Sequence, residues 1–210
     1  MSGPAVTPAV KRRVTCPGVT DFWYISTVSD MLRQSGKSGI DEQLVTTPAG
    51  GASKVAYIGT ILHGQELNVC VLLDSDLEGQ GAYRQLVHHW IIDRQKVLML
   101  GELLGGMKNA TLEDLFDRDY YLAMTEVAYA KELDGRHLKD WVKPGAAIVA
   151  SVGEALQDVG VETFNKGRVA KHIMSDLAGK TLSDLGADTE MKFSRVIEAL
   201  SAIMAKWKAA

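Results

Sequence analysis

Four short apolar runs in the first half of the chain alternate with longer segments that have helical periodicity. Between the first two runs, Ile25, Val28 and Leu32 recur at the spacing of one helix face, and Gly36 marks the end of that segment. The runs have the length and the valine and leucine content of buried strands. They are RVTC (13–16), QLVTT (43–47), LNVCVLL (67–73) and KVLML (96–100). This alternation favours an α/β fold whose mostly parallel sheet has helices on both faces.

After about residue 110 the pattern predicts helices only. Thr111 followed by Asp114 is typical of a cap that opens a helix. The apolar stripe of that helix is expected at Tyr120, Met124, Val127 and Ala128. Further helices are expected within 143–160, 164–179 and 189–210, the last with a stripe of Val196, Leu200, Ile203 and Trp207. The predicted organisation is a flexible leader (1–12), an α/β core (13–135) and a helical extension packed on it (136–210).

Composition is that of a soluble globular protein: 210 residues, 46% hydrophobic and 23% charged. No apolar run has membrane-spanning length, and the N-terminal residues lack the apolar centre of a secretory signal. Two cysteines are too few for a disulfide framework, so the cytoplasm is the expected location. The net charge of −3 excludes a strongly basic nucleic-acid coat, but it leaves a nuclease open because acidic metal sites lower the net charge.

Acidic residues follow three of the four predicted strands. Because the carboxyl ends of parallel strands meet at one edge of a sheet, these side chains are expected to converge. Carboxylates with few histidine or cysteine partners suit hard cations such as Mg²⁺ or Mn²⁺. The alternative is that each acid is an ordinary helix N-terminal residue, favoured by the helix dipole. The acids are Asp21, Asp74, Asp76, Glu113 and Asp114.

The stretch DSDLEG (74–79) allows other interpretations. It matches the opening of a calcium-binding loop, but Gln85 occupies the twelfth position, where a bidentate glutamate is expected. A phosphatase of the haloacid dehalogenase type also carries Asp-x-Asp after a strand, with Asp74 as the nucleophile. Its motif normally lies in the first strand and continues with threonine or valine, whereas Leu77 stands here.

Four segments in order carry a more specific signal: PGVTDFWYIS (17–26), VLLDSDLEG (71–79), ATLEDLF (110–116) and FNKGRVAKHI (164–173). Together they resemble the C-terminal Toprim domain of the OLD (overcoming lysogenisation defect) family of nucleases, over roughly residues 11 to 180. The resemblance implies a Toprim-like sheet of about four strands sandwiched by helices, with an added C-terminal helical element. It also implies a phage-defence endonuclease that cleaves DNA by a two-metal mechanism with Mg²⁺ or Mn²⁺.

The same resemblance implies partners. An ABC-type ATPase domain normally precedes the nuclease domain in the same chain, and self-association is common in the family. No GxxxxGK[ST] motif occurs in these 210 residues, so only the nuclease part is expected here.

Site residues follow from the matched segments. Lys166 is implied as a catalytic lysine near the scissile phosphate, and Asp114 is a less favoured neighbour of one metal ligand. The implied metal ligands are Asp21, Asp74, Asp76 and Glu113.

One position departs from the family pattern. Pro17 stands where the family carries a glutamate at the end of the first strand, and residues 1–20 contain no aspartate or glutamate. Proline offers no side-chain ligand and no general base, so one metal ion is expected to be weakened or lost. The alternative function is therefore a catalytically weakened module that binds DNA or a partner of an OLD-type system.

Overall fold

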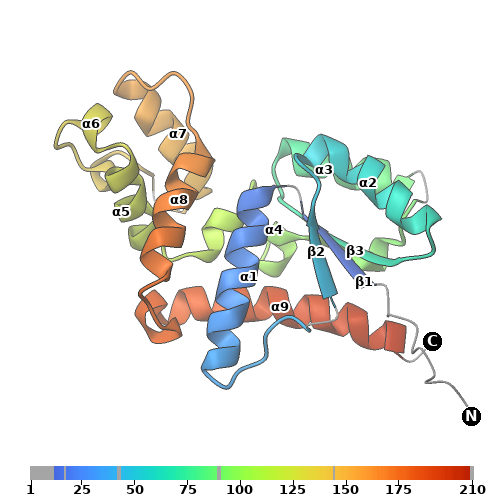
Figure 1. Ribbon diagram of the computed structural model, residues 1–210. Coiled ribbons are helices and arrows are strands. Elements are labelled where there is room, and N and C mark those ends of the chain that lie inside the picture. Colours follow the sequence, from blue (N-terminus) through green and yellow to red (C-terminus); the bar gives the residue numbers. More distant parts are fainter. Residues whose placement is uncertain (1–11, 17, 42–43, 89–90, 144, 209–210) are drawn as a thin grey trace, which may run out of the picture.

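A parallel β-sheet, with helices packed on it, forms one half of the molecule (Figure 1). The computed structural model describes residues 12–16, 18–41, 44–88, 91–143 and 145–208. In these residues the sheet has four strands in the order β2-β1-β3-β4, and Arg12 is paired with Leu44 on one side and Asn68 on the other. The strands are β1 (Arg12–Cys16), β2 (Leu44–Pro48), β3 (Asn68–Leu73) and β4 (Val97–Met99). All four predicted strands are confirmed, and none of their ends is shifted by more than one residue.

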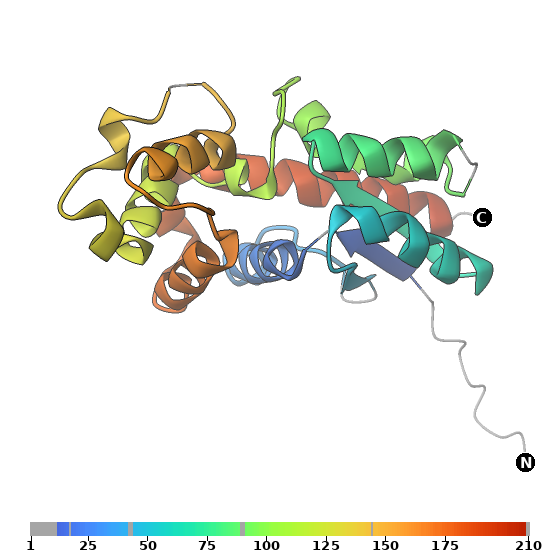
Figure 2. The same ribbon diagram turned by 90° about the horizontal axis from the view of Figure 1, so that it is seen from above.

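Helices cover both faces of this sheet, as Figures 1 and 2 show. On β3, Val69 and Val71 pack with α2 (Ala52–Gly64) and α3 (Leu77–His88). The alternate residues Cys70 and Leu72 pack with α1 (Val19–Gln34) and α9 (Gly186–Lys208). Because successive side chains point to opposite faces, a strand between two helical layers must be apolar throughout, which explains NVCVLL. The predicted α/β fold class is confirmed, and the architecture is consistent with a Toprim-like fold.

The remaining helices extend the molecule beyond the α1 side of the sheet (Figure 1). Thr27 of α1 lies 3.9 Å from the sulfur of Met174 in α8, so α8 packs directly beside α1. Helix α9 runs past both the sheet and this helical group (Figures 1 and 2). The helices of this group are α5 (Arg118–Ala128), α6 (Ala130–Leu133), α7 (Ile148–Asp158) and α8 (Lys166–Leu177), whereas the short α4 (Leu100–Leu103) directly follows β4 beside the sheet (Figure 1).

One hydrophobic cluster contains residues from Val14 to Met204 and so crosses the predicted boundary between 135 and 136. The domain division stays a prediction, and its leader lies almost entirely outside the described residues. Within the described ranges, no helix combines the length and apolar character needed to cross a membrane.

The helix predicted to open at Thr111 begins later. Thr111 and Asp114 cap a short 3-10 turn (Leu112–Leu115), and Phe116 is extended before α5 starts at Arg118. The predicted stripe of α5 is confirmed in part: Ala128 is buried and Tyr120 and Met124 pack against the core, whereas Val127 is 54% exposed. Tyr121, Leu122 and Thr125 are also buried, so the buried face is wider than the predicted stripe.

The calcium-loop interpretation of DSDLEG is wrong. Helix α3 starts at Leu77, directly after Asp76, and continues to His88. Positions five to twelve of the supposed loop are therefore part of one continuous helix.

Candidate metal centre

The loop after β3 is fixed to the segment that follows β4. The Oδ1 atom of Asp74 accepts a hydrogen bond from the Leu112 amide at 3.1 Å. The Ser75 amide donates to the Ala110 carbonyl at 2.7 Å, and the Gly101 amide donates to Ser75 Oγ at 2.8 Å. Asp74 is only 9% exposed. Its carboxylate is therefore held at the carboxyl edge of the sheet by hydrogen bonds across that edge.

Glycine at position 79 makes this geometry possible. A Cβ atom on Gly79 would lie 2.0 Å from the Asp74 carbonyl oxygen, far inside van der Waals contact. Gly81, in the same helix, has no atom within 4 Å of the corresponding position. The first glycine of LEGQG is thus required by the approach of α3 to the strand end, while the second is not.

Asp76 lies at the rim of the same loop. Its Oδ1 accepts a hydrogen bond from the Gly79 amide at 2.8 Å, which caps the start of α3. The side chain is half-buried, and the next residue, Leu77, is 81% exposed. One carboxylate oxygen of Asp76 is used to cap the helix. The interpretation of this acid as an ordinary helix N-terminal residue therefore holds for that oxygen.

Asp21 comes from the first turn of α1. Its Oδ2 accepts a hydrogen bond from the Gly18 amide at 2.7 Å, as a capping acid does. Its exposure is 3%, unlike that of an ordinary surface cap. Burial, and then the negative charge of Glu113, raise the pKa of Asp21, while Lys166 opposes this rise. Asp21 therefore lies close to Glu113, which is distant in sequence.

Glu113 and Lys166 form an ion pair inside this region. Glu113 is fully buried, and both of its carboxylate oxygens lie 3.2 Å from Lys166 Nζ. Only Oε2 accepts a hydrogen bond from the ammonium; Oε1 has no hydrogen-bond partner among the described residues. Lys166 is the first residue of α8, where a positive charge opposes the helix dipole. The acidic surroundings, and not helix formation, favour a cation at this position.

Asp114, unlike its neighbour Glu113, has a structural role. Its Oδ2 accepts from the Thr111 amide and its Oδ1 accepts from the Ile148 amide, both at 2.8 Å. Because both oxygens accept hydrogen bonds from backbone amides, Asp114 joins the 3-10 turn to the start of α7.

Electrostatic coupling shows that four side chains from four segments lie together. Burial, then the charge of Asp21, raise the pKa of Asp74 well above its usual value. Burial alone would lower the pKa of Lys166, but Glu113, Asp74 and Asp21 together raise it. Three buried acidic side chains thus lie near a single ammonium group.

The donor atoms suit a hard cation. All are carboxylate oxygens, and one of them, Glu113 Oε1, is buried without a hydrogen bond. Across the described residues, however, no group of three or more histidine, cysteine, aspartate or glutamate side chains is arranged so that it could hold an ion directly. Glu113 faces Lys166 instead. The residues fit a divalent cation in chemistry and burial, but the Lys166 ammonium occupies the space beside the Glu113 carboxylate.

Three residues near the cluster were not predicted. Cys16 ends β1, and burial followed by Asp21 raises the pKa of its thiol, so it stays protonated and is a poor ligand for Mg²⁺. The hydroxyl groups of Tyr24 and Tyr121 are buried without hydrogen-bond partners among the described residues. Burial, and then Glu113, raise the pKa of both tyrosines. The spacing of Asp21 and Tyr24, three residues apart on a helix, was the available signal.

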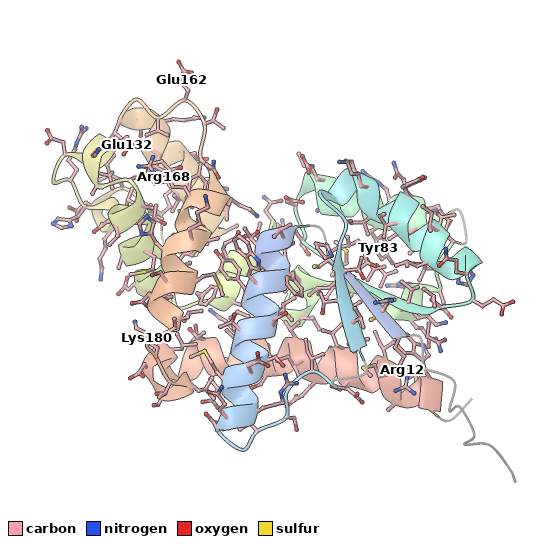
Figure 3. The ribbon with its side chains drawn as sticks, viewed as in Figure 1. Arg12, Tyr83, Glu132, Glu162, Arg168 and Lys180 are labelled. Carbon is pink, nitrogen blue, oxygen red and sulfur yellow. The ribbon has the colours of Figure 1, made fainter. Side chains whose placement is uncertain are left out.

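A hollow of about 490 Å³ lies between the first turns of α1 and α8, next in sequence to Asp21 and Lys166. Arg168 at its wall is already engaged: it forms an ion pair with Glu132, visible in Figure 3, and lies 4.2 Å from the centre of the Tyr129 ring. The hollow is lined by Val19, Thr20, Trp23, Asn165, Gly167, Arg168 and Lys171.

Pro17, the position of the missing family glutamate, lies outside the described residues. No protein family, curated protein or solved structure matches this chain. The fold and the cluster define an α/β protein with a four-stranded parallel sheet in its described residues and buried carboxylates at the carboxyl edge of that sheet.

Proposed function

We propose that this chain is a metal-dependent endonuclease domain that nicks or cuts DNA with Mg²⁺ or Mn²⁺. The observation that supports the proposal is the burial of Asp21, Asp74 and Glu113 together around Lys166. Burying like charges is costly, and a bound divalent cation is the simplest compensation. The four-segment resemblance to OLD-family Toprim domains contains all four residues.

The metal ligands proposed are Asp21, Asp74 and Glu113, with Asp76 at the rim. One or two bound ions would polarise a phosphodiester and activate water. Asp74 and Asp21 are pre-oriented by the Leu112 and Gly18 amides, which limits reorganisation on binding.

Lys166 is proposed to stabilise negative charge on the phosphate during cleavage. The adjacent hollow is proposed to receive the DNA backbone, and Lys171 on its wall is exposed. Such local charge permits DNA binding at a net charge of −3. A cytoplasmic location, an ABC-type ATPase partner and self-association are parts of the same proposal.

A second function is favoured by one specific feature. Pro17 replaces the expected glutamate, and residues 1–20 supply no other carboxylate. A chain with a weakened second metal position would bind DNA or a partner without efficient cleavage.

The test is nicking of supercoiled plasmid with Mg²⁺ or Mn²⁺. The wild type should nick, Asp74→Asn should not, and Asp140→Asn, a neutralisation at an exposed site, should behave as wild type. Absence of nicking with either metal at all protein concentrations would exclude an active nuclease. DNA binding without nicking, with cleavage gained in Pro17→Glu, would support the second function. Hydrolysis of a phosphomonoester that Asp74→Asn abolishes would instead favour the phosphatase interpretation.

A further inference from the structure

The ion pair between Lys166 and Glu113 joins a movable cation to a fixed anion. Glu113 is fully buried in a 3-10 turn whose neighbour Asp114 is bonded to two backbone amides. The Lys166 side chain is 31% exposed and extends from the first turn of α8. Of the two partners, only the lysine can leave without disturbing the core.

The ammonium also occupies the position from which Glu113 could serve a metal ion. Its nitrogen is 3.2 Å from both carboxylate oxygens, and the coupling extends to Asp74 and Asp21. Among the described residues, the acids are not arranged to hold an ion directly. An ammonium nitrogen 3.2 Å from both carboxylate oxygens fills the space that a divalent cation bound to Glu113 would need.

We infer that Lys166 and a divalent cation are alternative partners of Glu113. In the metal-free protein the lysine neutralises part of the buried acidic cluster and keeps it folded. When a cation binds, the lysine is released toward the neighbouring hollow at the start of α8, which Thr20 and Trp23 also line. Metal loading thereby makes a positive charge available where a phosphate would enter. The inference rests on the metal site of the proposed function, but not on DNA cleavage.

The first test is Mn²⁺ binding to the DNA-free protein, measured by calorimetry. Lys166→Met should bind Mn²⁺ about tenfold more tightly than wild type, because a charged hydrogen bond that is partly screened by solvent no longer competes. Lys166→Arg keeps the charge and should retain wild-type affinity. Lys131→Met removes an exposed lysine and should leave affinity unchanged. Equal or weaker Mn²⁺ binding by Lys166→Met would overturn the inference, because the lysine would then position Glu113 for the metal.

The second test uses wild-type protein and so does not depend on the folding of a variant. Lysine acetylation is followed by mass spectrometry with and without Mn²⁺, with Lys171 on the same helix as the internal reference. Labelling of Lys166 relative to Lys171 should increase severalfold when Mn²⁺ is added. An unchanged ratio at saturating Mn²⁺ would contradict release.

These results separate the inference from the proposed nuclease activity. A protein that fails to nick DNA but shows the Mn²⁺ competition supports the inference and excludes the activity. A protein in which neither the wild type nor Lys166→Met binds Mn²⁺ overturns both.

Discussion

Replacing Asp74 by asparagine should stabilise the metal-free protein and abolish its stabilisation by Mn²⁺. Asparagine keeps the size of the side chain and its Oδ1, so the hydrogen bond from the Leu112 amide can persist. The substitution removes one negative charge that is buried beside Asp21 and Glu113. It also removes a ligand. The variant should therefore gain stability without metal and lose the response to metal, a crossed pattern that ordinary damage to the fold does not produce.

The magnitudes follow from burial and linkage. A raised folded-state pKa costs the ionised protein about 1.4 kcal/mol for each unit of the rise, and Asp74→Asn recovers this free energy at neutral pH. For a chain of this size, 1 kcal/mol corresponds to roughly 2–4 °C in Tm. In the wild type, Mn²⁺ at a hundred times its Kd adds about 2.7 kcal/mol. The variant should thus melt a few degrees higher than wild type without metal, and at a similar or lower temperature when Mn²⁺ is present.

The stability that Asp74→Asn gains over wild type should also depend on pH. The folded-state pKa of Asp74 lies well above the value in the unfolded chain. In the wild type, the associated stability is fully present below the unfolded pKa of about 3.9 and is lost as pH rises through the folded pKa. The advantage of Asp74→Asn should therefore be smallest in acid and grow toward neutral pH.

The assay is thermal unfolding of wild type, Asp74→Asn and the exposed control Asp140→Asn across this pH range, with EDTA or Mn²⁺. The control should match wild type in both conditions. A metal-free Asp74→Asn protein that melts below wild type at neutral pH, yet keeps the full Mn²⁺ response, would refute the reasoning.

Two further substitutions test the supports of the site, with urea unfolding as the measurement. Gly79→Ala should lower the free energy of unfolding by roughly 1–3 kcal/mol, because its Cβ would overlap the Asp74 carbonyl. Gly81→Ala should raise it by up to about 1 kcal/mol through helix propensity. Equal effects of the two substitutions would contradict the close approach of Gly79 to Asp74. Asp114→Ala should lose about 2–3 kcal/mol, because two amides lose their acceptor, and should keep wild-type Mn²⁺ affinity. A loss of Mn²⁺ affinity in that variant without a loss of stability would show that Asp114 is a ligand.

The sheet and most helices could be predicted because their patterns are local. Burial of β3 on both faces and the stripe of α9 follow from residues a few positions apart. The start of α5 could not be predicted, because the extended backbone at Phe116 separates the capped 3-10 turn from the helix. Neither pattern nor capping rules reveal such a break when the surrounding residues all favour helix.

The candidate site was accessible from the sequence only in outline. Strand ends placed Asp21 and Asp74 at one edge, but they could not separate Glu113 from Asp114. That distinction depends on Ile148, 34 residues farther along the chain. The pairing of Lys166 with Glu113, across 53 residues, likewise requires the packing of α8 beside α1. Such contacts have no local signature, so the family resemblance alone suggested the lysine.

The most direct test of the proposed metal centre is a crystal soaked in Mn²⁺, with the ion located by its anomalous scattering. We predict a peak coordinated by Asp74 with Asp21 or Glu113, and a Lys166 side chain turned away from Glu113. A well-ordered crystal at saturating Mn²⁺ with no peak among these carboxylates, and with Lys166 still paired to Glu113, would contradict the account.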